Sequence, residues 1–265
     1  MKMRLISVFA ACLLTISLSG CAKTPEGIPR EMLADKDAAM AIVFYRDYMA
    51  SATIATLTKI REEKRDEAIQ TQEYILDEII VEVGPALPKY TPAQRKIAAG
   101  IFVKIAEHYS AFPRNNSKWY QDLLPEKKED YVKIDDLLKD CIKKTRRMPE
   151  REFAGHKPLL PILILRDHMA GIAIQTLIML RNGKGGNATR SLEDALDRLV
   201  LEAGPQIDLL GYDGQDRAAS MFAKIKHYRE KYPRTAGKDD KVEAMLTGIT
   251  SKYKPHSMQT FFGAE

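Results

Sequence analysis

The sequence predicts an all-α protein in which two tandem four-helix units pack as one eight-helix body. After the first thirty residues, apolar residues recur with the period of a helix, and no segment has the alternation of a strand. Residues 45–114 recur without a gap as residues 165–234, with roughly a third of the positions identical at a spacing of 120. Because this period is much longer than that of solenoid repeats, we interpret it as the internal duplication of a domain-sized unit.

Each unit is expected to begin with its longest helix, over residues 37–61 and 159–181. These are the most apolar stretches of the chain after its N-terminus. A helix that is apolar nearly all round is buried on most sides. We therefore expect the two long helices to be central and to join the units into one body.

A second helix is expected over residues 67–83 and 191–203. Gly-Pro follows each of them. Proline cannot continue a helix, and glycine readily adopts the left-handed conformation found at many helix ends. We therefore expect Gly84 and Gly204 to be left-handed caps.

Polar pairs with the spacing of a capping box mark the starts of three helices. The pairs are Thr91 with Gln94, Ser191 with Asp194, and Asp213 with Asp216. The first and third open the third helix of each unit, which should end near Pro113 or Pro233. A fourth helix is expected over residues 126–144 and 238–253.

The N-terminus has the layout of a secretory signal. Lys2 and Arg4 form a charged start, and residues 5–16 form an apolar stretch that is too short to cross a bilayer. Small residues follow. The ending of this segment, Leu18-Ser19-Gly20-Cys21, closely resembles the lipobox of bacterial lipoproteins.

This resemblance implies that cleavage leaves Cys21 as the N-terminus, carrying thioether-linked and amide-linked acyl chains such as palmitate. Several acyl chains on one residue give stable membrane anchoring. In Gram-negative sorting, a residue other than aspartate after the cysteine implies the outer membrane, and here that residue is Ala22. The resemblance therefore implies a lipid-anchored protein that faces the periplasm.

The expected organisation has four parts. They are a signal peptide (1–20), a lipidated tether (21–30), a first four-helix repeat (31–148) and a second four-helix repeat (149–265). Residues 145–158, which hold several basic residues, glycine and proline, form the expected connector between the repeats.

Charge and cysteine content exclude some functions. Removal of Lys2 and Arg4 with the signal lowers the formal net charge from +5 to +3, which is too small to favour nucleic acid as a partner. Once Cys21 is lipidated, Cys141 is the only remaining thiol, so no disulfide is expected within the chain. Its helical pattern among leucines predicts a buried structural role.

Charged residues recur on one face of the first and second helices of both units. They are Arg46, Asp47, Arg61, Glu73 and Glu82, with Arg166, Asp167, Arg181, Glu193 and Glu202 at the same positions 120 residues later. If the first two helices form an antiparallel hairpin, Arg46 comes level with Glu82 and Arg61 with Glu73. We predict that these pairs fix the register of buried helices. The alternative is an anion-binding pocket around Arg46 and Arg166.

No motif predicts a catalytic centre, a metal site or a cofactor. The chain lacks the His-Glu-x-x-His and Cys-x-x-Cys-His motifs, and the glycine-rich residues 182–187 lack the spacing of a phosphate-binding loop. Glu73 and Asp77 could act as paired carboxylates, although this spacing more often marks an ion-paired stripe of a helix.

The function that these observations favour is a non-enzymatic, lipid-anchored envelope protein that binds a protein partner. It would act as an adaptor, an assembly or secretion accessory factor, or an inhibitor. One alternative is a small-ligand or lipid-binding lipoprotein with an enclosed pocket in each repeat. Another is an envelope hydrolase that uses carboxylates with raised pKa values in a cleft.

Overall fold

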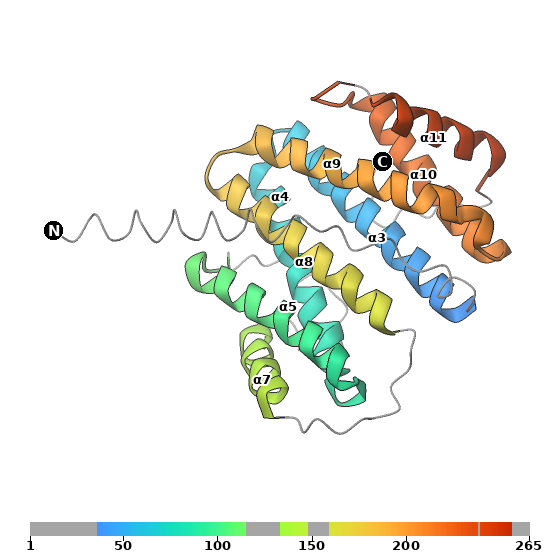
Figure 1. Ribbon diagram of the computed structural model, residues 1–265. Helices are drawn as coiled ribbons and strands as arrows, with labels where there is room; N and C mark the ends of the chain where they lie inside the picture. Colours follow the sequence, from blue (N-terminus) through green and yellow to red (C-terminus); the bar gives the residue numbers. More distant parts are fainter. Residues whose placement is uncertain (1–35, 115–132, 148–158, 238, 256–265) are drawn as a thin grey trace.

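The structure, a computed structural model, describes residues 36–114, 133–147, 159–237 and 239–255, and within them the chain is all-α, as predicted (Figure 1). The α-helices of these residues are α3 (Lys36–Arg61), α4 (Arg65–Val83), α5 (Pro92–Ala111), α7 (Ile134–Arg147), α8 (Leu159–Arg181), α9 (Gly185–Ala203), α10 (Tyr212–Lys231) and α11 (Asp240–Lys252). Two 3₁₀-helices, η1 (Leu87–Lys89) and η3 (Gly204–Leu209), precede α5 and α10. The expected signal peptide, Cys21, the tether and most of the connector lie outside the described residues.

The two long central helices are α3 and α8, as the sequence predicts. They contact each other, and each forms a hairpin with the helix that follows it in the chain. Figure 1 shows α8 between α5 and α9. Residues 160–181 of α8 are apolar and long enough to cross a membrane, but a core helix passes the same test, and 44% of the window is buried inside the molecule.

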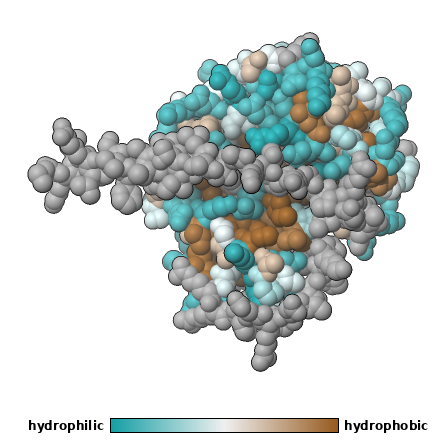
Figure 2. All heavy atoms as spheres, viewed as in Figure 1, coloured by the Kyte–Doolittle hydropathy of each residue, from teal (hydrophilic) through white to brown (hydrophobic). Residues whose placement is uncertain are grey.

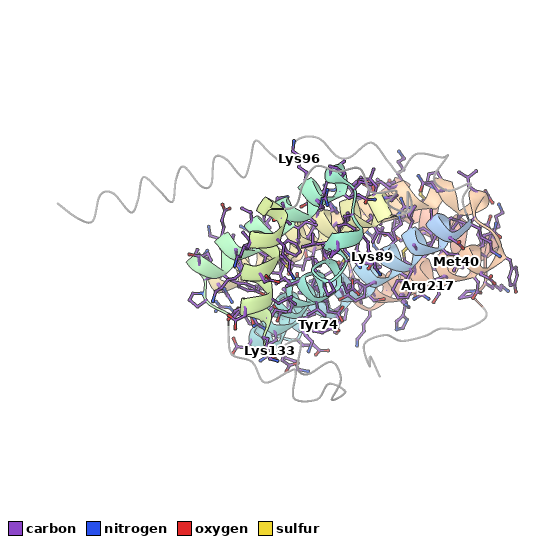
Figure 3. All side chains as sticks on the ribbon, turned by 90° about the horizontal axis from the view of Figure 1, so that it is seen from below. Met40, Tyr74, Lys89, Lys96, Lys133 and Arg217 are labelled. Carbon is purple, nitrogen blue, oxygen red and sulfur yellow. The ribbon has the colours of Figure 1, made fainter. Side chains whose placement is uncertain are left out.

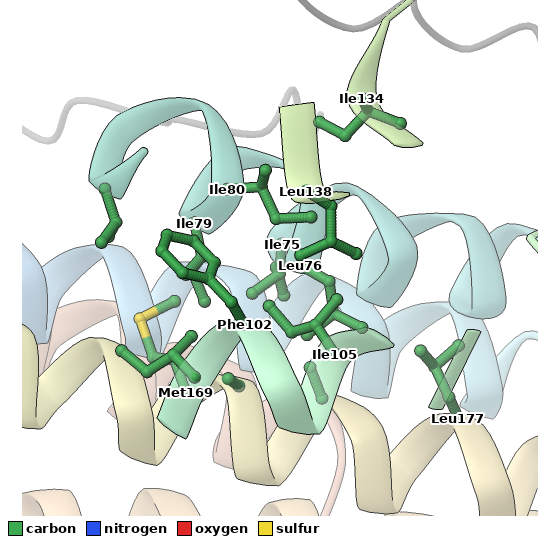
Figure 4. Packing of buried hydrophobic residues seen from close by; sticks show 14 of the residues in the cluster. Ile75, Leu76, Ile79, Ile80, Phe102, Ile105, Ile134, Leu138, Met169 and Leu177 are labelled. Atoms are coloured by element: carbon green, nitrogen blue, oxygen red, sulfur yellow. The ribbon is translucent and has the colours of Figure 1, made fainter. Parts of the chain in front are cut away.

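The two halves of the chain exchange their first helices. Helix α8 packs most extensively against α4 and α5, whereas α3 packs most extensively against α10. One core cluster accordingly joins α8 to α4, α5 and α7, and it includes Phe102, Ile105 and Leu177 (Figure 4). The second joins α3 to α9, α10 and α11. The described parts of the two halves are therefore interleaved into one body.

Helices related by the 120-residue spacing have matching lengths. Helices α4 and α9 each have 19 residues and begin 120 positions apart, and α5 and α10 each have 20 residues with the same spacing. The interpretation of this spacing as a duplication stays a prediction.

Gly84 and Gly204 are not the left-handed caps that the sequence predicts. Their φ angles are −58° and −55°, in the right-handed helical region. Glycine is needed there because the last helix of each half passes close to its backbone. A Cβ atom on Gly84 would lie 2.6 Å from the sulfur of Cys141, and one on Gly204 would clash with the sulfur of Met245. Cys141 is buried, as predicted.

The predicted capping boxes are right at one helix and wrong at two. Thr91 and Gln94 form a complete capping box at the start of α5. Ser191 lies inside α9, which begins at Gly185, and α10 begins after Gly211 with no side-chain cap. Helix α7 begins at Ile134, and residues 126–132 of the predicted fourth helix lie outside the described residues. Helix α11 begins at Asp240, two residues later than predicted, and is capped by Asp239, whose carboxylate accepts from two backbone amides.

Candidate functional site

The repeated charged residues lie where each long helix meets the other half of the chain. Arg61 donates to the carboxylate of Glu193 and, at 2.8 Å, to the hydroxyl of Thr235. Arg181 donates to Glu73 and, at 2.9 Å, to the backbone oxygen of Phe112. The predicted pairing of Arg61 with Glu73 inside one hairpin is therefore wrong. The hairpin forms, but the charged face of each long helix turns towards the opposite half.

The same exchange holds at the other end of the long helices. Arg166 donates to Glu82 at 2.6 Å and stacks over the ring of Tyr45, with its guanidinium carbon 4.8 Å from the ring centroid. Arg46 donates to Gln206 at 2.7 Å. Burial lowers the pKa of Arg46 to about 10, although the charge of Glu202 opposes this shift. The sequence predicts a pair between Arg46 and Glu82, whereas each arginine turns towards the other half.

Both repeated aspartates contact a lysine of the third helix in the opposite half. Lys224 of α10 lies 2.8 Å from Asp47, and Lys104 of α5 lies 2.8 Å from Asp167. The charged residues that the sequence predicts as partners do not include these lysines. They are recognisable, because they are identical residues at the 120-residue spacing.

Asp77 is a fully buried carboxylate. It accepts a hydrogen bond from the hydroxyl of Tyr109 at 3.0 Å and pairs with the guanidinium of Arg114. Burial raises the pKa of Asp77 to about 7, although Arg114 and Tyr109 lower it. Since its neighbour Glu73 is paired with Arg181, both carboxylates of this pair are held by arginines within the helix packing.

The interior beside these charges is filled. One turn along α3 and α8 from Arg46 and Arg166 lies a space lined by Met49, Gln72 and Met169, with a volume of about 20 Å³. That volume holds about one water molecule, whereas ligand pockets have volumes of about 300 Å³ or more. The buried arginines are therefore packed against protein groups in the described residues.

An apolar area lies on the surface where α5 and α8 run side by side. Figure 2 shows hydrophobic residues gathered over these helices. Val103 on α5 is 37% exposed, and Ile97 and Ile164 are partly exposed. Lys104 and Asp167 form an ion pair beside them. We call this area the α5–α8 face.

A hollow lies between the start of α3 and the start of α10, and both apolar and charged residues line it. The hollow has a volume of about 260 Å³, and Lys36, Met40, Leu209 and Leu210 are among the residues that line it. Figure 3 shows Met40 of α3 and Arg217 of α10 at this end of the molecule.

Several basic residues of α7 and α10 pair with carboxylates within the molecule. On α10, Lys224 pairs with Asp47, and Arg229 with Asp197 and Glu243. On α7, Lys144 pairs with Asp140. These basic residues therefore contribute to contacts within and between helices.

The described residues contain no group of three or more His, Cys, Asp or Glu side chains that could hold a metal ion. No protein-family model matches the chain, and no curated protein or solved structure is significantly similar to it. Arguments about function therefore depend on the geometry of this chain alone.

Proposed function

We propose that this chain is a non-enzymatic, lipid-anchored helical protein of the cell envelope that binds a protein partner through the α5–α8 face. Cys21 would carry the acyl chains, and the outer membrane facing the periplasm is the location that the lipobox-like ending favours. The roles that fit are an adaptor, an assembly or secretion accessory factor, and an inhibitor.

The observation that carries this proposal is the exposure of apolar side chains on the α5–α8 face. Exposed apolar areas with polar residues at the rim are typical of protein interaction sites. Val103 stands beside the ion pair of Lys104 and Asp167, which supplies such a rim.

The pairing of the buried carboxylates with arginines supports a binding role more than a catalytic role. Glu73, Asp77 and Asp197 each pair with an arginine in the protein interior. A general acid or base must lie within hydrogen-bond reach of a substrate. These carboxylates lie among helices, where they stabilise the packing.

The proposal is tested by capture of envelope proteins on the mature chain with Cys21→Ser and an N-terminal tag. Detergent-solubilised envelope should yield a specific retained protein, identified by mass spectrometry. Val103→Asp should reduce its recovery at least about tenfold, because burying an unpaired charge in an interface costs several kcal/mol.

Ala223→Asp is the matched control, because Ala223 occupies the corresponding position on α10 and is partly exposed. This variant should retain the partner, and both variants should melt at the temperature of the parent chain. Equal recovery by the two variants would contradict a docking role for the α5–α8 face. Retention of small molecules or lipid alone would support the ligand-binding alternative.

A further inference from the structure

The hollow between α3 and α10 differs from the corresponding place in the other half of the chain. Leu210 and Gly214 at the hollow stand where the first half has Tyr90 and Gln94. Tyr90 is 1% exposed and Gln94 is 3% exposed, so that end of the first half is filled by side chains. In the second half, glycine stands in place of this buried glutamine, and Gly214 lines the hollow.

Two exposed apolar residues lie at the hollow or next to it in sequence, and the lining of the hollow also includes Asp213. Leu209 is 44% exposed and Tyr212 is 68% exposed, which are two of the largest exposures among the apolar residues of the described chain. The corresponding positions in the first half hold Lys89 and Pro92. A leucine and a tyrosine therefore face solvent here, at positions where the first half has a lysine and a proline.

The hollow lies where the described chain begins. Lys36 is both the first residue of α3 and part of the lining of the hollow. The fourteen residues between Cys21 and Lys36 span at most about 50 Å when fully extended. If Cys21 carries acyl chains in the bilayer, the end of the molecule that holds Lys36 can reach the bilayer more easily than any other part, because the segment between Cys21 and Lys36 then needs the least extension.

We propose that this end of the molecule lies on the membrane that holds Cys21, with Leu209 and Tyr212 at the boundary between head groups and acyl chains. Tyrosine is enriched at that boundary because its ring is apolar and its hydroxyl is polar. The side chain of Lys36, which lines the hollow, would extend its ammonium group to the head groups while its methylene groups stay in the apolar layer. The hollow, which Met40 and Leu210 line, would hold part of an acyl chain. The proposal rests on the lipid anchor of the proposed function.

The test uses the mature chain coupled through Cys21 to a maleimide phospholipid in vesicles of phosphatidylethanolamine and phosphatidylglycerol. Cys141 is 1% exposed, so the coupling is selective. A single tryptophan is placed by Tyr212→Trp in a background that carries Trp119→Phe, which removes the one native tryptophan. Lipids with brominated acyl chains quench tryptophan that lies at the membrane boundary.

The emission of the tryptophan introduced by Tyr212→Trp should fall by at least about half when brominated lipids replace ordinary ones. The control is Lys143→Trp in the same background, because Lys143 is exposed on α7, which packs against α4 and α5 and away from the hollow. Its emission should change little. Unchanged emission from the Tyr212→Trp variant, or equal quenching of the two variants, would overturn the proposal. Because the lipid is attached chemically, this result depends neither on lipidation in cells nor on a protein partner. Failure of the membrane contact proposed here can therefore be distinguished from failure of the proposed function.

Discussion

The guanidinium groups of Arg61 and Arg181 each form an ion pair with a carboxylate from the opposite half of the chain. The acceptors Glu193 and Glu73 are almost completely buried. Removal of one partner of a buried ion pair leaves an uncompensated charge and typically costs about 3–5 kcal/mol. The residues that recur at the 120-residue spacing are thus explained by the packing of the long helices.

The buried imidazole of His108 should make the stability of the folded protein depend on pH. It is 4% exposed and stacks on Phe112, and burial together with the charge of Arg181 lowers its pKa to about 4. In the unfolded chain the imidazole of His108 binds a proton near pH 6.5, whereas in the folded chain it binds one only near pH 4. The stability that neutral His108 contributes is therefore complete above pH 6.5 and is lost as the pH falls towards 4.

Urea unfolding of the parent chain and of His108→Phe at pH 7 and pH 4.5 measures this effect. The free energy of unfolding of the parent should fall by ~2 kcal/mol more than that of the variant on acidification. The phenylalanine keeps the stacking on Phe112 and removes the titrating group. Equal losses in the two proteins would show that His108 is not responsible.

Helix ends show how far the sequence determines the elements and where tertiary contacts take over. The range 159–181 predicted for the second long helix agrees with α8, and the capping box of α5 is confirmed. The prediction for Gly84 is wrong because glycine is required there by the close approach of Cys141, which is distant in sequence, and not by a positive φ angle. Likewise, helical periodicity identifies the charged face of α3 but not the helix that covers it. The exposed α5–α8 face could not be predicted either, because exposure depends on which helices leave a surface uncovered.

Gly84→Ala tests the close approach of α7 to the end of α4. The added methyl would lie 2.6 Å from the sulfur of Cys141, so something must shift. Overpacking of this kind costs about 1–3 kcal/mol of stability. Chemical denaturation measures the change.

Gly100→Ala is the matched control for this variant. Gly100 lies inside α5, and a Cβ atom there would meet nothing within 4 Å. Alanine in a helix interior is favoured over glycine by about 1 kcal/mol, so this variant should be as stable as the parent or more stable. Similar destabilisation by both variants would argue against a specific contact at Gly84.

At the scale of the whole molecule, the exchange of α3 and α8 makes the two halves interdependent. The core formed by α9, α10 and α11 is completed by α3, and that formed by α4, α5 and α7 is completed by α8. A half that lacks its exchanged helix exposes a large apolar surface. The molecule should therefore unfold in one cooperative transition.

Cleavage of the chain between the halves tests this interdependence. A protease site placed within residues 148–158 should be cut without separating the fragments, because each fragment holds a helix buried in the other. The two fragments should co-elute in size-exclusion chromatography with unchanged helical circular dichroism. Two separately eluting folded fragments would show that the halves are independent domains.

Double-mutant cycles on Arg61 test the central claim, the exchange of the long helices, most directly. The cycle combines Arg61→Met with Glu193→Gln, and a second cycle combines Arg61→Met with Glu73→Gln. Residues in contact show coupling energies of about 0.5–3 kcal/mol, whereas distant residues are additive within about 0.5 kcal/mol. The structure predicts coupling of at least about 1 kcal/mol with Glu193 and near-additivity with Glu73. Strong coupling with Glu73 and none with Glu193 would place α3 in its own half and contradict the exchange.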